Sequence, residues 1–215
     1  VDLARGTRAR LTRTRTPIAD VQPSPDGDAV AFSRDGELWV AHATAEGPAE
    51  TRRTFDGTED VLNATLDWVY PEELDATTAI QWSPDGTRLA FTAEGDGTDA
   101  EDVFVQPIDR SSTPVRVLRM PNDQHSWSWP SDSVLVFASN AVPRGLRGAG
   151  FRGGSIAITD PRSPAATPRI YLESQDGVNN PAVSPDGRYV AFTSNENGTS
   201  EIYVRPFPSS GTGGQ

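Results

Sequence analysis

The chain contains no cysteine and no lysine, and no apolar run approaches the roughly 18 residues that a membrane helix needs. The absence of cysteine excludes disulfides, thiolate metal sites and cysteine nucleophiles. Only two histidines are present, His42 and His125, and neither belongs to an H-x-x-x-H or H-E-x-x-H motif. With 19 basic and 30 acidic residues, the net charge of −11 argues against nucleic acid as a partner. We therefore expect no metal, no cofactor and no membrane insertion.

What the chain does contain is a repeated motif, Ser-Pro-Asp-Gly, at Ser24–Gly27, Ser83–Gly86 and Ser184–Gly187. Proline pre-sets φ at the first central position of a turn, aspartate accepts nearby backbone N–H groups, and glycine tolerates positive φ. Alternating apolar and polar residues follow each copy, which is typical of a half-buried strand. The repeated unit is therefore all-β. The predicted turn residues are Asp26, Gly27, Asp85, Gly86, Asp186 and Gly187.

A degenerate copy of the motif at Ser131 brings the number of units to four. Self-similarity at this spacing predicts a repeat architecture, here a β-propeller with four blades of four antiparallel strands each. One propeller domain would span residues 1–215, ending in a flexible tail at 208–215. The predicted blades cover residues 17–55, 79–120, 125–174 and 179–207.

The fourth unit lacks an outermost strand, and residues 7–14 resemble that missing strand. We expect this N-terminal strand to complete the last blade, with residues 8–13 beside residues 201–205. The ring would then be closed, and no sheet edge would remain exposed to other chains.

The repeats resemble those of TolB-like β-propellers, most closely in the unit SPDGRYVAFTSNENGTSEIYVRPFP, which begins at Ser184. The resemblance extends over nearly the whole chain and implies the propeller fold. Such repeats serve scaffolds, receptors and enzyme lids alike, so the fold alone does not decide the function. The first hypothesis is a non-catalytic binding or scaffold domain with a protein or peptide ligand.

A second resemblance is carried by residues 55–91, FDGTEDVLNATLDWVYPEELDATTAIQWSPDGTRLAF. This stretch is similar to the propeller of dipeptidyl peptidase IV-type enzymes of the prolyl oligopeptidase family. The resemblance implies that Glu72 and Glu73 bind the free N-terminal amine of a peptide substrate, framed by Asp67 and Tyr70. Two adjacent carboxylates can make charge-assisted hydrogen bonds to one ammonium group, and shelter from water strengthens those bonds.

The chain departs from that family in several respects. Pro71 stands where the family usually has an acidic or polar residue, and Ala64 stands where it has glycine. The family's propeller has more blades. No G-x-S-x-G nucleophile elbow is present, so we expect the chain itself not to be an enzyme. The second hypothesis is a substrate-gating propeller separated from its hydrolase domain, and the third is an engineered or minimal propeller without an evolved function.

Three of the connections between predicted strands are unusually long, namely residues 56–78, 94–102 and 140–154. The second connection is acidic and could hold a hard cation, but it lacks the EF-hand spacing, so a solvated loop is favoured. The chain opens without an apolar signal segment, whereas the family resemblance favours an extracytoplasmic or secreted location. Ligand identity and oligomeric state stay open.

Overall fold

The computed structural model describes residues 10–44, 47–58, 61–65, 78–94, 101–118, 124–140, 154–163 and 167–208. All regular elements in these ranges are strands, and they form four separate antiparallel sheets. The described part of the chain contains no helix long and apolar enough to cross a membrane. The expectation of an all-β chain with four sheets is confirmed.

We call the four sheets blades 1 to 4 in chain order. Blade 1 consists of β1 (Ala19–Pro23), β2 (Ala29–Arg34), β3 (Glu37–Thr44) and β4 (Gly47–Arg52). Blade 2 consists of β5 (Ile80–Trp82), β6 (Arg88–Glu94), β7 (Glu101–Pro107) and β8 (Val115–Arg116). Blade 3 consists of β9 (Gln124–Ser131), β10 (Val134–Asn140), β11 (Gly154–Thr159) and β12 (Arg169–Ser174). Blade 4 has only β13 (Val178–Val183), β14 (Tyr189–Ser194) and β15 (Glu201–Pro206).

The Ser-Pro-Asp-Gly motif forms the same turn in blades 1, 2 and 4, between the first and second strands. In the second copy the Ser83 hydroxyl donates to Asp85 at 2.5 Å and accepts the Arg88 N–H at 2.9 Å. Gly86 closes the turn at φ +69°, which a residue with a side chain rarely adopts. The bonds within each turn join residues at most five apart, so this geometry is set locally.

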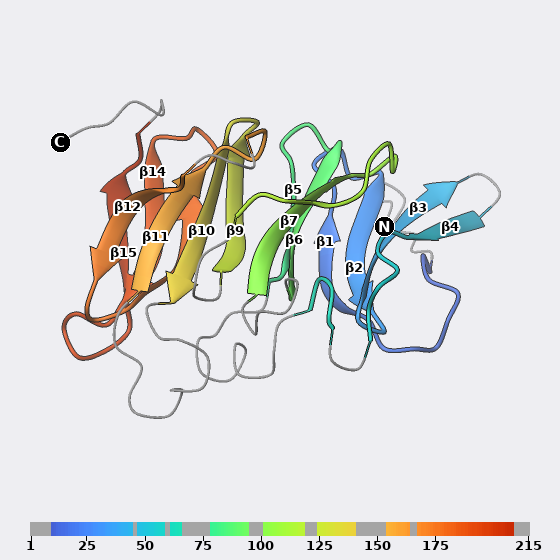
Figure 1. Ribbon diagram of the computed structural model, residues 1–215, viewed down its shortest axis with the longest axis horizontal. Coiled ribbons are helices and arrows are strands. Elements are labelled where there is room, and N and C mark those ends of the chain that lie inside the picture. The colour runs from blue at the N-terminus through green and yellow to red at the C-terminus, as the bar shows by residue number, and fades with distance from the viewer. Residues whose placement is uncertain are drawn as a thin grey trace, which may run out of the picture.

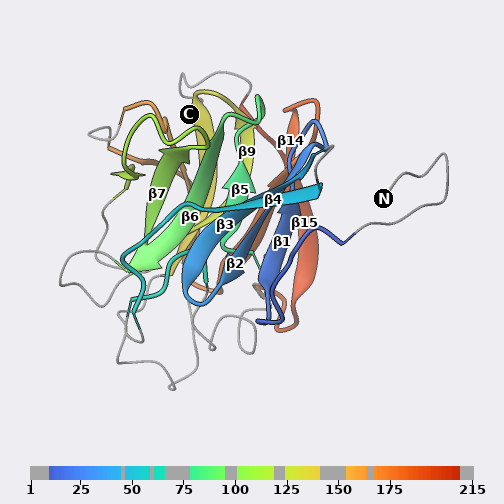
Figure 2. The same ribbon diagram turned by 90° about the vertical axis from the view of Figure 1, so that its right-hand side faces the viewer.

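The core lies between successive blades rather than inside any one of them. One cluster joins Leu38 and Val40 of blade 1 to Leu89 and Phe91 of blade 2. Two further clusters join blade 2 to blade 3 and blade 3 to blade 4 in the same way. The blades therefore stand in a row, with blade 1 at one end and blade 4 at the other (Figure 1), and the view along the row shows them one behind another (Figure 2).

The expected closure of the ring is wrong for the part of the N-terminal segment that the structure describes. The backbone N–H of Arg13 donates to Glu50 on β4, and Arg34 donates to the Thr14 hydroxyl at 3.2 Å. The N-terminal segment therefore contacts blade 1. Among the described residues no strand pairs with the outer edge of β15, and Ile202 on that strand is 78% exposed.

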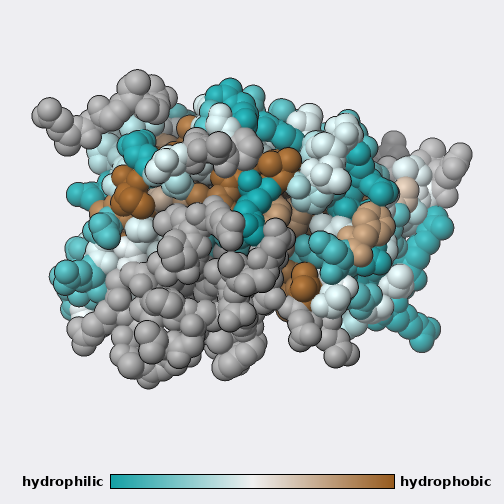
Figure 3. All heavy atoms as spheres, in the orientation of Figure 1, coloured by the Kyte–Doolittle hydropathy of each residue, from teal (hydrophilic) through white to brown (hydrophobic). Residues whose placement is uncertain are grey.

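The physical reason is the position of the blades. Blades 1 and 4 lie at opposite ends of the row, while the buried ion pair between Arg34 and Glu50, at 2.5 Å, offers the N-terminal segment polar partners nearby. Figure 3 shows apolar atoms at the surface of the end where β12 lies. Within the described residues the four blades thus form an open row, and the expected closure is not seen there.

Candidate functional site

The four residues that the dipeptidyl peptidase resemblance singles out are Asp67, Tyr70, Glu72 and Glu73. All four fall within residues 66–77, which lie outside the described residues. The structure does describe both ends of this segment and the scaffold that holds them.

Both ends of the segment are attached to a single residue of blade 2. The N–H of Ala64 donates to the carbonyl of Thr92 at 2.8 Å, and the N–H of Thr92 donates to the carbonyl of Ala79 at 3.1 Å. Thr92 lies on β6 and is completely buried, and a further β-bridge joins Asn63 to Ala93. The residues just before and just after the segment are therefore held at one point of blade 2, near the end of β6.

The connection that precedes the segment is anchored by a buried acid, Glu37, which is only 2% exposed. Its carboxylate accepts hydrogen bonds from Arg52, the Thr54 hydroxyl, the Gly57 N–H at 2.7 Å and the Asn63 amide at 3.5 Å. A carboxylate with several donors is well compensated for its burial. Glu37 thus ties residues 52–63 to the start of β3.

Two positions in this connection have backbone requirements. A Cβ on Gly57 would lie 2.6 Å from Glu37 Oε1 and 2.6 Å from the Gly36 carbonyl oxygen, so the Glu37 carboxylate leaves room only for glycine. Ala64 has φ +55° and is completely buried. This left-handed conformation costs a residue with a Cβ about 1–2 kcal/mol, which gives a physical reason why the resembling family has glycine there.

The other end of the segment is held from blade 1. Asp20, at the start of β1, accepts the N–H of Ala79 and also accepts the Gln22 amide at 2.7 Å. Burial raises the pKa of Asp20 above its usual range, and the bonds from Gln22, Ala79 and Ile80 oppose that rise. The hydrogen bond from the Ala79 N–H to Asp20 therefore links the first strands of blades 1 and 2 at the point where the segment ends.

The three long connections of the sequence start and end at the same edge of the blades. Glu94 pairs with Glu101, and Asn140 pairs with Gly154, so the second and third connections each bridge the end of a blade's second strand. The segment after Thr65 begins at that same end of blade 2. The Ser-Pro-Asp-Gly turns lie at the opposite end, because successive strands are antiparallel. The described ends of all three connections therefore lie at one edge of the blades, the lower one in Figure 1.

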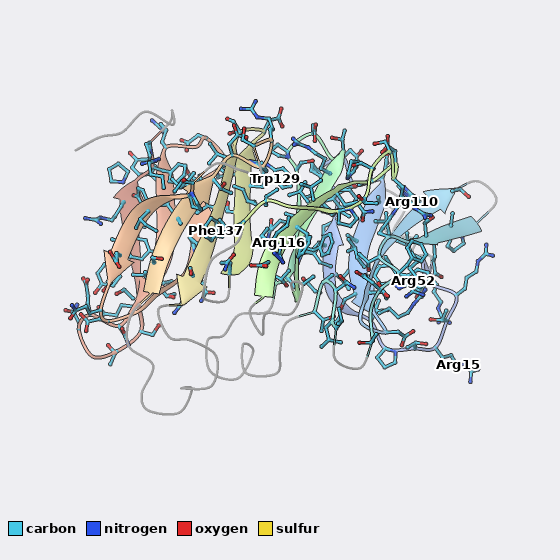
Figure 4. The ribbon with its side chains drawn as sticks, in the orientation of Figure 1. Arg15, Arg52, Arg110, Arg116, Trp129 and Phe137 are labelled. Carbon is cyan, nitrogen blue, oxygen red and sulfur yellow. The ribbon has the colours of Figure 1, made fainter. Side chains whose placement is uncertain are left out.

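The acidic connection at 94–102 was a candidate cation site, and one of its members proves to have a different environment. The Asp102 side chain is 2% exposed and makes an ion pair with Arg116 at 3.0 Å, inside blade 2 (Figure 4). Among the described residues no group of three or more His, Cys, Asp and Glu side chains could hold a metal ion. Asp102 therefore pairs with Arg116 inside blade 2.

Sequence reasoning missed Glu37 and Asp20. Glu37 follows an Asp-Gly turn at the first position of a strand, where an acid ordinarily faces solvent. Its partners Gly57 and Asn63 lie 20 and 26 residues further along the chain. No sequence pattern connects residues so far apart, so only the fold identifies the two acids as anchors.

The family model described as the dipeptidyl peptidase IV (DPP IV) N-terminal region matches residues 1–122. A probable dipeptidyl-aminopeptidase B of Chaetomium globosum is 36% identical over 90 residues, which are 37% of this chain and 10% of that protein. The chain thus matches about a tenth of that relative's length.

Two solved structures share the fold. Dipeptidyl peptidase 4 of Porphyromonas gingivalis gives a TM-score of 0.66 at 20% identity, over 93% of this chain and 34% of its own. A putative TolB from Agrobacterium tumefaciens gives 0.60 at 18% identity, over 91% of this chain and 60% of its own. At these identities the likeness concerns the fold alone, and it extends well beyond the stretch that the family model matches.

Proposed function

The chain belongs to the family of dipeptidyl peptidase IV N-terminal regions, and from this premise we propose that it recognises the free amino terminus of a peptide through Glu72 and Glu73. The matched residues 1–122 include the whole of residues 55–91, which carry the acid pair. In this proposal the chain binds and admits peptides, and a hydrolase domain supplies the catalytic serine.

The observation that carries the proposal is the attachment of both ends of residues 65–78 at Thr92. The Ala64 N–H bonds to the Thr92 carbonyl at 2.8 Å, and the Ala79 carbonyl accepts the Thr92 N–H at 3.1 Å. Glu37 and Asp20 reinforce the two ends from blade 1. A rigid base of this kind suits a recognition segment, because binding groups on pre-organised supports lose less conformational entropy on binding.

The chemistry of the acid pair fits an ammonium group. A primary ammonium has three N–H donors, and two neighbouring carboxylates offer charge-assisted acceptors for them. The chain's net charge of −11 also favours cationic ligands. A solvated ion pair contributes only about 0–1 kcal/mol, so we expect weak binding by this chain alone.

A second candidate function is a TolB-like binding or scaffold propeller that makes no use of the acid pair. It is favoured by the share of the matched structure that this chain spans, which is 60% for the putative TolB and 34% for dipeptidyl peptidase 4. In that case Glu72 and Glu73 are an inherited part of the connection between blades 1 and 2.

One titration separates the two candidates. A short peptide with a free amino terminus and the same peptide with an acetylated terminus are titrated into the wild-type chain and into Glu72→Gln/Glu73→Gln. Glu173→Gln is the matched control, because Glu173 is an exposed acid on β12 of blade 3. We expect the free peptide to bind more tightly, and we expect the double substitution, but not the control, to remove the difference.

Equal binding of the two peptides by the wild-type chain would leave the scaffold function. The same preparation should not cleave Xaa-Pro dipeptide reporters, because the sequence contains no G-x-S-x-G elbow. If the chain did cleave these reporters, and a serine-directed phosphonate abolished the cleavage, the proposal that a separate hydrolase domain supplies the catalytic serine would be wrong.

A further inference from the structure

A pocket of about 640 Å³ lies between blades 1 and 2. The connection after β4 forms one wall with Arg53 and Phe55, β6 and β7 contribute Phe91, Phe104 and Gln106, and the loop after β7 adds Arg110. Phe91 and Phe104 stack with ring centroids 5.9 Å apart. The pocket thus combines aromatic surface with two guanidinium groups.

Arg53 is the unusual residue of this pocket, because it is 8% exposed and makes no ion pair with any described residue. Its Nε has no hydrogen-bond partner in the described part of the chain. The other well-buried arginines have acids, since Arg34 pairs with Glu50 at 2.5 Å and Arg116 with Asp102 at 3.0 Å. A buried charge without a partner is costly, so Arg53 lacks the compensation that the others have.

The acid nearest to Arg53 in charge terms, Asp109, compensates it only in part. Burial lowers the pKa of Arg53, the positive charge of Arg110 lowers it further, and Asp109 acts in the opposite direction. Asp109 accepts the Ser111 N–H at 2.9 Å, and Asp56, the acid that lines the pocket, accepts the Asn63 amide at 3.0 Å. Both carboxylates therefore already have partners.

The second cation of the pocket is held over an aromatic ring. The guanidinium of Arg110 lies 4.9 Å from the centre of the Phe55 ring, and that of Arg52 lies 5.1 Å from the same ring. Arg52 and Arg110 come from different blades, as Figure 4 shows. Arg52 is bound to Glu37, so Arg53 and Arg110 are the cations that face the pocket without an acid of their own among the described residues.

Gln106 supplies an acceptor beside this donor. Its amide nitrogen donates to the Arg53 carbonyl at 3.3 Å, while its Oε1 is buried and has no hydrogen-bond partner in the described part of the chain. A ligand that satisfies both residues needs an anionic oxygen for Arg53 and an N–H for Gln106. An N-acyl amino acid meets both requirements, because it has a carboxylate and an amide N–H on one carbon.

We propose that this pocket binds the carboxylate end of an N-acylated amino acid with an aromatic or apolar side chain. Arg53 holds the carboxylate with support from Arg110, Gln106 accepts the amide N–H, and the side chain lies against Phe91 and Phe104. Two sources carry this chemistry, the C-terminal residue of a peptide and a free N-acyl amino acid. The proposed contacts use neither Glu72 nor Glu73, so this proposal does not rest on amine recognition.

The test is calorimetric titration of the whole chain with N-acetyl-phenylalanine and with its carboxamide. We expect the acid to bind at least about tenfold more tightly than the carboxamide, because hydrogen bonds to charged groups are the stronger ones. Arg53→Met should remove this preference and leave the urea midpoint unchanged or raised, since it deletes an unpaired buried charge. Gln106→Met is the second variant, and it should weaken both probes.

Two controls make the result specific. Arg188→Met removes a 70% exposed arginine side chain on blade 4 and should leave binding unchanged. Glu72→Gln/Glu73→Gln should also leave it unchanged, so failure of this proposal and failure of the amine-recognition proposal are distinguishable. A peptide ending in phenylalanine identifies the source: tighter binding than N-acetyl-phenylalanine indicates a chain terminus, and equal binding indicates the free acid. Equal binding of acid and carboxamide, no binding of either, or full binding by a folded Arg53→Met chain would overturn the proposal.

Discussion

Replacing Glu37 by glutamine tests whether a single buried carboxylate supports the base of the recognition segment. The substitution keeps the size of the side chain and removes its charge. All four partners of Glu37 are donors, namely Arg52, the Thr54 hydroxyl, the Gly57 N–H and the Asn63 amide. A glutamine offers one carbonyl oxygen and turns an NH₂ group toward the remaining donors. At least one pair of donors must therefore lose its acceptor.

The size of the effect follows from which donors can find water. The Arg52 side chain is 36% exposed and can turn outward, so its loss counts little. Thr54 and Asn63 are 3% and 4% exposed, so their donor groups cannot turn toward water. An orphaned buried donor costs about 1–3 kcal/mol, and breaking a fully buried pair costs about 3–5 kcal/mol. We expect Glu37→Gln to lower the free energy of unfolding by about 2–4 kcal/mol.

The assay is urea denaturation followed by circular dichroism and tryptophan fluorescence, with Glu173→Gln as the control. The control removes an exposed acid from β12 and should change the free energy of unfolding by less than about 0.5 kcal/mol. Hydrogen exchange should also show faster exchange of the Gly57 N–H, which Glu37 accepts directly. A Glu37→Gln chain as stable as the control, with unchanged exchange at Gly57, would refute the reasoning that this carboxylate anchors residues 52–63.

Two further predictions concern the repeated turns. Ser83→Ala should lower the free energy of unfolding by about 1–3 kcal/mol, and Ser184→Ala should lower it by less than about 1 kcal/mol. The reason is that Ser83 is completely buried whereas Ser184 is only partly buried. Equal losses in urea denaturation would contradict this order. The serine hydroxyls lower the pKa values of Asp26, Asp85 and Asp186, so the stability that these carboxylates contribute is complete above the unfolded-state pKa near 4 and is lost as the pH falls through the lower folded-state values. Urea midpoints at pH 6 and pH 3 should therefore differ less in Ser83→Ala than in the wild type, and an unchanged pH dependence would count against the Ser83–Asp85 bond.

The amino-acid sequence by itself determined the repeated unit. Ser-Pro-Asp-Gly specifies its turn through bonds that span at most five residues, as between the Ser83 hydroxyl and the Arg88 N–H. The apolar residues after each turn also specify a strand, although Leu89 and Phe91 pack toward blade 1 and Ala90 packs toward blade 3, so that strand is buried on both faces rather than half-buried. The sequence also identified the segment with Glu72 and Glu73 through its family resemblance, because a motif of consecutive residues can be recognised without knowing which other residues it contacts.

The arrangement of those units was decided only by the tertiary structure. The N-terminal segment resembles an outer strand, yet its partner is Glu50 of blade 1 rather than β15, since the row places blades 1 and 4 at opposite ends. Glu37 bonds to residues 20 and 26 positions away, and Arg53 lacks the acid that Arg34 and Arg116 each find on another strand of their own blade. Hydrogen bonds within a turn depend on neighbouring residues alone, whereas the compensation of a buried charge depends on which distant segments the packed blades bring beside it.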